Sequence, residues 1–293
     1  MNGVPVLFFE GLVFHFVNKE TLLAGSALSG RLGHVASEVY AKRCRQYIGV
    51  TNGQLEKESY FNCEDQELDI ETLSRKHLRF TVVDIYADKG EYSTDPEAME
   101  RVLSATMGNA ILLSLQTPNI SEEIAKCVES IRLVSELHVN TNITSDVLKM
   151  LRLLVEKNTL IGMHINEDVE IEDETTQLLV DLLKQNQFHE MFLPAKCSAA
   201  LKTIIASWRE NSEEMVEKMV YCKEEFPELK LSSTEFPFHK CTGEDEHDAK
   251  RAYYGPSGWS IITTKSVMKT QNGSAVYCLS RRYRLFKTVF VFA

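Results

Sequence analysis

A short apolar pattern recurs five times in the middle of the chain and limits the possible folds more than any other feature. Each copy has the spacing apolar-x-x-apolar-x-apolar, and successive copies lie 24 to 30 residues apart. A repeat of this length is typical of solenoid proteins, in which one supersecondary unit stacks on the next. The five copies are Phe80, Val83, Ile85; Ala110, Leu113, Leu115; Val134, Leu137, Val139; Leu160, Met163, Ile165; and Phe188, Met191, Leu193.

A helical pattern follows each copy, so each repeat predicts one strand and one helix. Ser121 and Ser198 stand where helix N-caps are expected, and Glu122 and Glu123 suit a first helical turn. Neither a single strand nor a single helix can bury its apolar side alone. Stacked units therefore predict parallel strands with helices covering one side. The alternative is a plain α/β sheet with regularly spaced crossover helices.

The segment before the repeats predicts a compact module of three short helices. Pro5 suits a first helical turn, because its fixed backbone angle and missing N–H are tolerated there. Leu12 and Phe16 continue the apolar side of this helix at four-residue spacing. Leu22 belongs to the second predicted helix, and Leu32 to the apolar side of the third.

Hairpin patterns flank the repeats on both sides. Asn52-Gly53 between two β-prone runs is typical of a two-residue hairpin turn, and Asn272-Gly273 predicts a second hairpin near the C-terminus. The strongly β-prone tail at 285–293 is expected to be covered, because an exposed apolar strand aggregates. The predicted organisation is a helical module at 1–43, a hairpin and linker at 44–77, a βα-repeat arc at 78–222 and a closing β region at 223–293.

Composition argues against several classes of protein. A net charge of -10 disfavours nucleic-acid binding, which rests on clustered Lys and Arg. No apolar run reaches the roughly 20 residues of a membrane span, and the first residues lack the basic start of a secretory signal. Seven cysteines without a C-x-x-C motif predict free thiols in a reducing compartment, hence a cytoplasmic or nuclear location.

The sequence contains no recognisable catalytic or cofactor motif. G-x-S-x-G, H-E-x-x-H and G-x-x-x-x-G-K-[ST] are all absent, so no enzyme activity and no cofactor are predicted. His239, Cys241 and His247 do not have the spacing of a common zinc site, so no metal is predicted. A Cys/His hydrolase is a distant alternative, since it would need a thiolate beside a base.

The repeats predict a binding surface on the side of the sheet that faces away from the helices. Side chains alternate along a strand, so the residue between the last two apolar positions of each copy points to this side. Aromatic anchors beside polar groups are typical of protein interfaces. Alternatives are a plain polar face, or a face covered by the segment 286–292. The predicted partner-binding residues are Ser114, His138, Asn140, His164, Asn166 and Phe192.

The N-terminal module resembles an F-box. That motif usually opens with Leu-Pro, has Asp-Leu at its second helix and ends on a Val-Ser-x-x-Trp turn, whereas Val4, Thr21 and Leu32 stand at the corresponding places here. The whole chain is similar to a divergent group of nematode proteins that join a short F-box to irregular leucine-rich βα repeats. The resemblance rests on Val4-Pro5, Leu12-Val13, Phe16-Val17, Thr21-Leu22-Leu23 and Leu28-Ser29-Gly30-Arg31-Leu32.

This resemblance implies both a fold and a role. The fold is α/β, with an F-box-like helical module, an irregular leucine-rich-repeat-like βα arc and C-terminal β-strands. The role is that of a substrate-recognition subunit in an SCF-type cullin–RING ubiquitin ligase, whose repeat arc binds an unknown protein substrate. The alternative is a stand-alone interaction scaffold whose helices only cap the repeats. The residues expected to bind the Skp-type adaptor are Pro5, Leu12, Phe16, Leu22 and Leu32.

Overall fold

A computed structural model describes residues 19–69, 71, 78–86, 100–102, 104, 110–222, 238–240, 242, 262–269, 274–281 and 288–293. The predictions for Pro5, Leu12 and Phe16 therefore lie outside the described residues. The same is true of Cys241, His247 and the expected turn at Asn272-Gly273. Leu22 is described by its backbone only.

The repeats form the centre of one mixed sheet, which has 13 strands in the described part of the chain. The repeat strands pair in parallel and in chain order, and Lys218–Cys222 (β9) continues the series. The predicted α/β class and the parallel stack of βα units are thus confirmed. The repeat strands are Leu78–Tyr86 (β4), Ala110–Leu115 (β5), Val134–Val139 (β6), Gly162–Ile165 (β7) and Glu190–Leu193 (β8).

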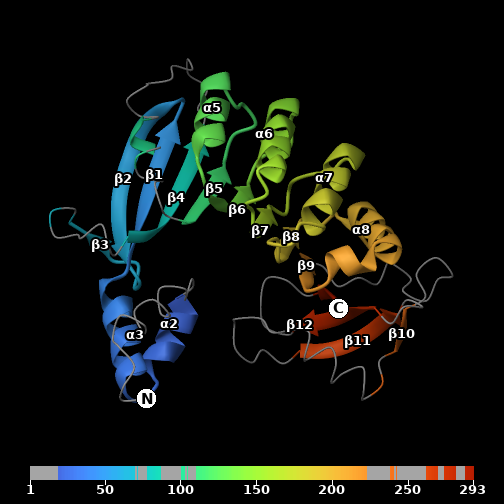
Figure 1. Cartoon of the computed structure of the whole chain (residues 1–293). Coiled ribbons are helices and arrows are strands. Elements are labelled where there is room, and N and C mark those ends of the chain that lie inside the picture. The colour runs from blue at the N-terminus through green and yellow to red at the C-terminus, as the bar shows by residue number, and fades with distance from the viewer. Residues whose placement is uncertain are drawn as a thin grey trace.

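Helices cover one face of this sheet and follow an arc over it (Figure 1). Leu137 and Met191 have none of their surface exposed and Met163 has 3%, so the repeated apolar pattern is the core that stacking buries. Ser121 caps its helix as predicted, whereas Ser198 begins its helix and Cys197 occupies the N-cap without a side-chain bond. The helices are Glu122–Ser130 (α5), Ser145–Glu156 (α6), Asp173–Leu183 (α7) and Ser198–Glu210 (α8), followed by the 3-10 turn Ser212–Met215.

The first hairpin consists of Cys44–Thr51 (β1) and Gln54–Asn62 (β2). Its turn residues Asn52 and Gly53 have φ values of 51° and 82°, as the predicted two-residue turn requires. β1 also pairs in parallel with β4 along its whole length, so the hairpin belongs to the repeat sheet. The short strand Glu67–Leu68 (β3) forms the edge on this side.

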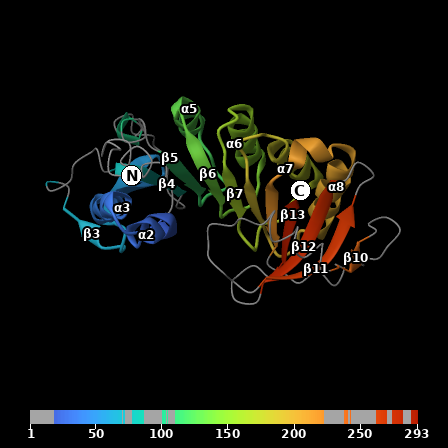
Figure 2. The ribbon, with the colours of Figure 1, turned by 60° about the horizontal axis from the view of Figure 1, so that its bottom comes forward.

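The C-terminal strands extend the other end of the sheet, as the turned view shows (Figure 2). The β-prone tail forms Thr288–Phe292 (β13), which lies between β9 and Ala275–Arg281 (β12) with all five residues buried. Ile262–Lys269 (β11) completes the predicted hairpin, and His239–Lys240 (β10) is the edge. Residues 288–292 therefore lie within the sheet, next to β9, and residues 286 and 287 lie outside the described part of the chain.

Two helices lie below the N-terminal end of β1 in Figure 1, and we call them the helix pair. They are Lys19–Ser26 (α2) and Arg31–Lys42 (α3). A Cβ atom at Gly33 would lie 1.7 Å from the carbonyl oxygen of Leu28, so only glycine permits this close approach. Val35 and Ala36 are buried in a small cluster of their own. None of the described helices is long and apolar enough to cross a membrane.

Two lysines connect successive repeats by donating to backbone carbonyl groups at the end of a helix or in the loop after it. The Lys157 ammonium donates to carbonyl oxygens of Val128 and Ile131, at 3.0 and 2.7 Å, at the C-terminal end of α5. The Lys218 ammonium donates in the same way after α7, and its residue is only 2% exposed. The last carbonyl groups of a helix, which Lys157 contacts, lack intrahelical partners and attract cations. Lys218 instead holds the loop between α7 and β8. The acceptors of Lys218 are the carbonyl oxygens of Gln185 (2.9 Å), Asn186 (3.2 Å) and Phe188 (2.6 Å).

Lys218→Met should lower the free energy of unfolding by about 2–3 kcal/mol, because three carbonyl groups lose a charged donor. Urea unfolding measures the change. Lys184→Met is the matched control, since its ion pair with Glu214 is long (3.8 Å) and lies at the surface. The control should lose less than about 1 kcal/mol. Equal losses of unfolding free energy in the two variants would show that the three hydrogen bonds of Lys218 add no more stability than a surface ion pair.

Candidate functional site

The sheet face opposite the helices, which we call the inner face, carries one continuous row of polar and aromatic residues. Backbone register aligns these residues strand by strand from β4 to β9. Four of the predicted partner-binding residues, from neighbouring strands, therefore lie side by side. The row consists of Asp84, Ser114, His138, His164, Phe192 and Tyr221.

The rings in this row contact one another. The ring centroids of His138 and His164 are 5.1 Å apart in an edge-to-face arrangement, and His164 is 5.4 Å from Phe192. Phe192 stacks on Tyr221 at 4.3 Å with an interplanar angle of 11°. Such contacts hold each ring in a defined orientation. The inner face thus presents a rigid ridge of rings across β6, β7, β8 and β9.

The next row adds amide groups, held by the hydroxyl of Ser114. Gln116 and Asn140 donate to this oxygen at 2.8 and 3.2 Å. Ser114 itself is only 3% exposed, so it orients its neighbours and offers little surface of its own. Asn166 accepts a bond from the backbone N–H of Glu167 at 2.6 Å. The amides of Asn140 and Asn166 lie beside the ring row at the carboxyl ends of β6 and β7.

The solvent exposure of the inner face changes from strand to strand. His138, His164 and Phe192 are half-buried, as are Asn140 and Asn166, so each exposes part of its side chain. Towards the C-terminal strands the face is closed in a second apolar cluster. Phe192 packs against this cluster, so the inner face is more accessible towards β4, β5, β6 and β7. The buried members of this cluster are Tyr221, Val267, Ala275, Tyr277, Val289 and Val291.

A hydrogen-bonded group of tyrosines lies at the other end of the row. Tyr86 donates to the Asp84 carboxylate at 3.1 Å, and the hydroxyls of Tyr47 and Tyr86 are 3.3 Å apart. The Tyr47 ring lies over Gly49, where a Cβ atom would be 3.6 Å from it, an ordinary contact distance. Burial and these hydrogen bonds raise the pKa of Tyr47. Sequence analysis missed Tyr47, because its partners Tyr86 and Asp84 lie on a strand far along the chain.

Two carboxylates flank a glycine on the inner face, two residues before the ring residues on each strand. Glu136 and Glu190 are the register partners of Gly162. Their Cγ atoms lie 3.9 and 3.5 Å from the place a Gly162 Cβ would take. Burial raises the pKa of both carboxyl groups, and the neighbouring charge of Glu136 raises that of Glu190 further. Sequence analysis missed this pair, although both glutamates occupy the same position of the repeated pattern.

His138 is uncharged at neutral pH. Burial lowers the pKa of its imidazole to about 4, and the neighbouring His164 lowers it further, whereas Asp84 acts in the opposite direction. A neutral ring neither attracts nor repels a charged partner strongly. Near pH 7, His138 therefore acts on the inner face as a flat, polar ring and as a hydrogen-bonding group.

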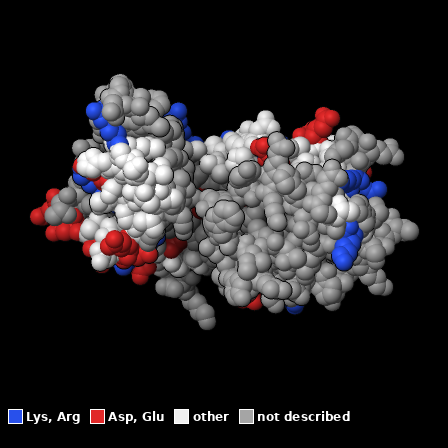
Figure 3. Space-filling model, turned by 90° about the horizontal axis from the view of Figure 1, so that it is seen from below, with Lys and Arg blue, Asp and Glu red and all other residues white. Residues whose placement is uncertain are grey.

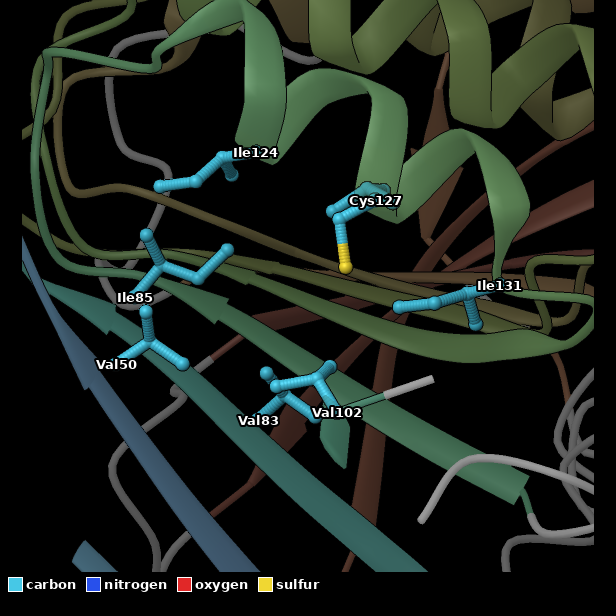
Figure 4. Close-up of a pocket in the computed structure, with 8 residues that line it drawn as sticks. Val50, Val83, Ile85, Val102, Ile124, Cys127 and Ile131 are labelled. Atoms are coloured by element: carbon cyan, nitrogen blue, oxygen red, sulfur yellow. The ribbon is translucent and has the colours of Figure 1, made fainter. Parts of the chain in front are cut away.

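The described thiols lie away from these imidazoles. Cys127 faces a small apolar cavity between the sheet and α5 (Figure 4), and burial raises the pKa of its thiol to about 11. His138 and His164 are on the opposite side of the sheet, so the structure brings no thiolate–imidazole pair together among these residues. The described residues also hold no group of three or more His, Cys, Asp or Glu side chains suited to a metal ion. Residues around the cavity include Val50, Val83, Ile85, Ile124 and Ile131.

Comparisons with known proteins find no match: no family model, no curated protein and no solved structure is similar to this chain. The F-box resemblance therefore stays a prediction from residues 4–32. Functional inference depends on the inner face and the helix pair themselves.

Replacing His138 with Asn should flatten the pH dependence of the free energy of unfolding between pH 6.5 and about 4. In this window the unfolded imidazole binds a proton and the folded one does not, so wild-type stability falls as the pH falls. Glu136 and Glu190 act oppositely, because a raised carboxyl pKa favours the folded chain on protonation. The difference between wild type and variant, from urea titrations at stepped pH, isolates His138. Parallel curves would contradict this assignment.

Proposed function

We propose that this chain is a protein-recognition subunit that joins two partners. Its helix pair contacts a Skp-type adaptor of a cullin–RING ubiquitin ligase, and its inner face contacts a protein substrate. The observation that carries the proposal is the exposure of Leu23 on α2 and of Leu28 in the turn between α2 and α3. The core of this helix pair is separate from that of the sheet. Each of these two leucines is 53% exposed.

The separate core of the helix pair favours docking over capping. A helix that only caps a solenoid packs its apolar side against the adjacent repeat. In the described part of the chain, the main core contains no side chain from α2 or α3. Leu32 packs instead on the small cluster around Val35 and Ala36. Seen from below, the area over the helix pair is largely uncharged (left in Figure 3), which suits an apolar helical interface.

The inner face supports the second contact. Its rings are held by mutual contacts and its amides by Ser114. These side chains therefore lose little conformational entropy when a partner binds. Half-buried aromatic residues between polar groups have the composition of an interface core and its rim. A stand-alone interaction scaffold would use this same face without an adaptor, and it is the second candidate.

Changing Leu23 and Leu28 together to Asp should reduce co-purification of the Skp-type adaptor at least about tenfold, since apolar anchors contribute most of the energy of such interfaces. The thermal melting of the sheet should stay nearly unchanged, because both side chains are exposed. Leu133→Asp with Ile161→Asp is the matched control, since these leucine and isoleucine side chains are also exposed but belong to the repeats.

Gly33→Ala provides a second variant, because a methyl group there collides with the backbone of Leu28 and separates the helix pair. It should lose the adaptor while the repeats stay folded. Undiminished adaptor binding by both the leucine variant and Gly33→Ala would exclude the helix pair as the docking site and favour the stand-alone scaffold.

A further inference from the structure

We propose that the inner face binds a basic, extended segment of its protein partner, with one Lys or Arg side chain seated over Gly162 between Glu136 and Glu190. This inference rests on the proposed function in one respect only, namely that the inner face contacts a protein. It adds the chemistry of that protein, which the row of rings alone does not specify.

The central strands of the sheet carry only negative charge. Strands β5, β6, β7 and β8 contain no Lys or Arg, and Glu136 and Glu190 are their only carboxylates. Asp84 adds a third carboxylate in the ring row on β4. A partner that binds across this area must complement a negative potential, because like charges brought together weaken an interface strongly. An acidic or phosphorylated segment is therefore disfavoured.

The two glutamates lack a partner of their own. Among the described residues, neither carboxylate makes a hydrogen bond or an ion pair, and the pKa of each is raised by burial without any compensating donor. A partly buried carboxylate without a donor is unfavourable, and two such groups repel each other. One cation placed between them removes both penalties. The other polar groups of the inner face, by contrast, have partners within the chain, as Ser114 and Asp84 do.

Gly162 leaves the position between the two glutamates without a side chain. The glycine itself is buried and the glutamates are half-buried, so the cation would lie between the two carboxylates rather than against the glycine. The Cγ contacts of 3.5 and 3.9 Å leave room for a methyl group but not for a long side chain without displacing the glutamates. His164 follows on the same side of β7 and contacts the ring of Phe192 at 5.4 Å, so aromatic rings lie beside the glutamate pair. His138 does not repel the cation, because it is neutral near pH 7.

The test uses the full chain and two labelled peptides, a glycine–arginine repeat and a glycine–serine repeat of the same length, in fluorescence anisotropy. Wild type should bind the arginine peptide at least about tenfold more tightly than the serine peptide. Glu136→Gln with Glu190→Gln should remove this preference. Glu156→Gln with Glu210→Gln, on α6 and α8, makes the same change in net charge at exposed sites and should preserve it.

Gly162→Leu is an independent variant, because it fills the gap while keeping both carboxylates. It should also lose the preference, whereas Gly162→Ala should keep most of it. Equal weakening by the two double-glutamine variants would show non-specific attraction to a chain of net charge -10 and would overturn the inference. Equal binding of the two peptides by wild type would overturn it as well. Adaptor co-purification is read separately, so the proposed adaptor contact stands or fails independently of this result.

Discussion

The stacking of one-strand, one-helix units is the constraint on which the rest of this structure depends. No unit can bury its apolar side alone, so each strand takes its place beside the previous one in parallel and brings Leu137, Met163 or their equivalents under the helices. The register of the rows then follows, because a shift by one residue would turn every core side chain to the opposite face. Lys157 joins the end of α5, and Lys218 joins the loop after α7, to later parts of the chain, which strengthens this stacking.

One consequence of this stacking is a sheet face that the helices leave uncovered. In an α/β sheet with helices on both sides, positions such as His138 and Glu136 would be apolar, because they would be buried completely. Here they are half-buried and keep a polar or aromatic character. The same register that builds the core thus also aligns His138, His164 and Phe192 into contact. The core and the inner face both result from the same alignment of strands.

Much of the fold and part of the site followed from local patterns. The five strands, the turn at Asn52-Gly53 and the row of His138, His164 and Phe192 were predictable, because each depends on period-two alternation or on a short turn motif. The parallel pairing of β1 with β4 was not predictable, since it joins residues separated by a hairpin and a long connection. The hydrogen bonds of Lys218 were not predictable either, because their acceptors lie about one repeat earlier in the chain.

The sequence by itself determined the βα repeat, its core residues and the side of each strand that faces away from the helices. These properties follow from hydrophobic periodicity, which is local. Only the tertiary structure decided that Glu136 and Glu190 lie on either side of Gly162, that Tyr47 reaches Tyr86, and that the helix pair keeps a core of its own. Each of these depends on which strands become neighbours and on how closely two helices approach. Such distances come from packing the whole chain, and no single segment contains them.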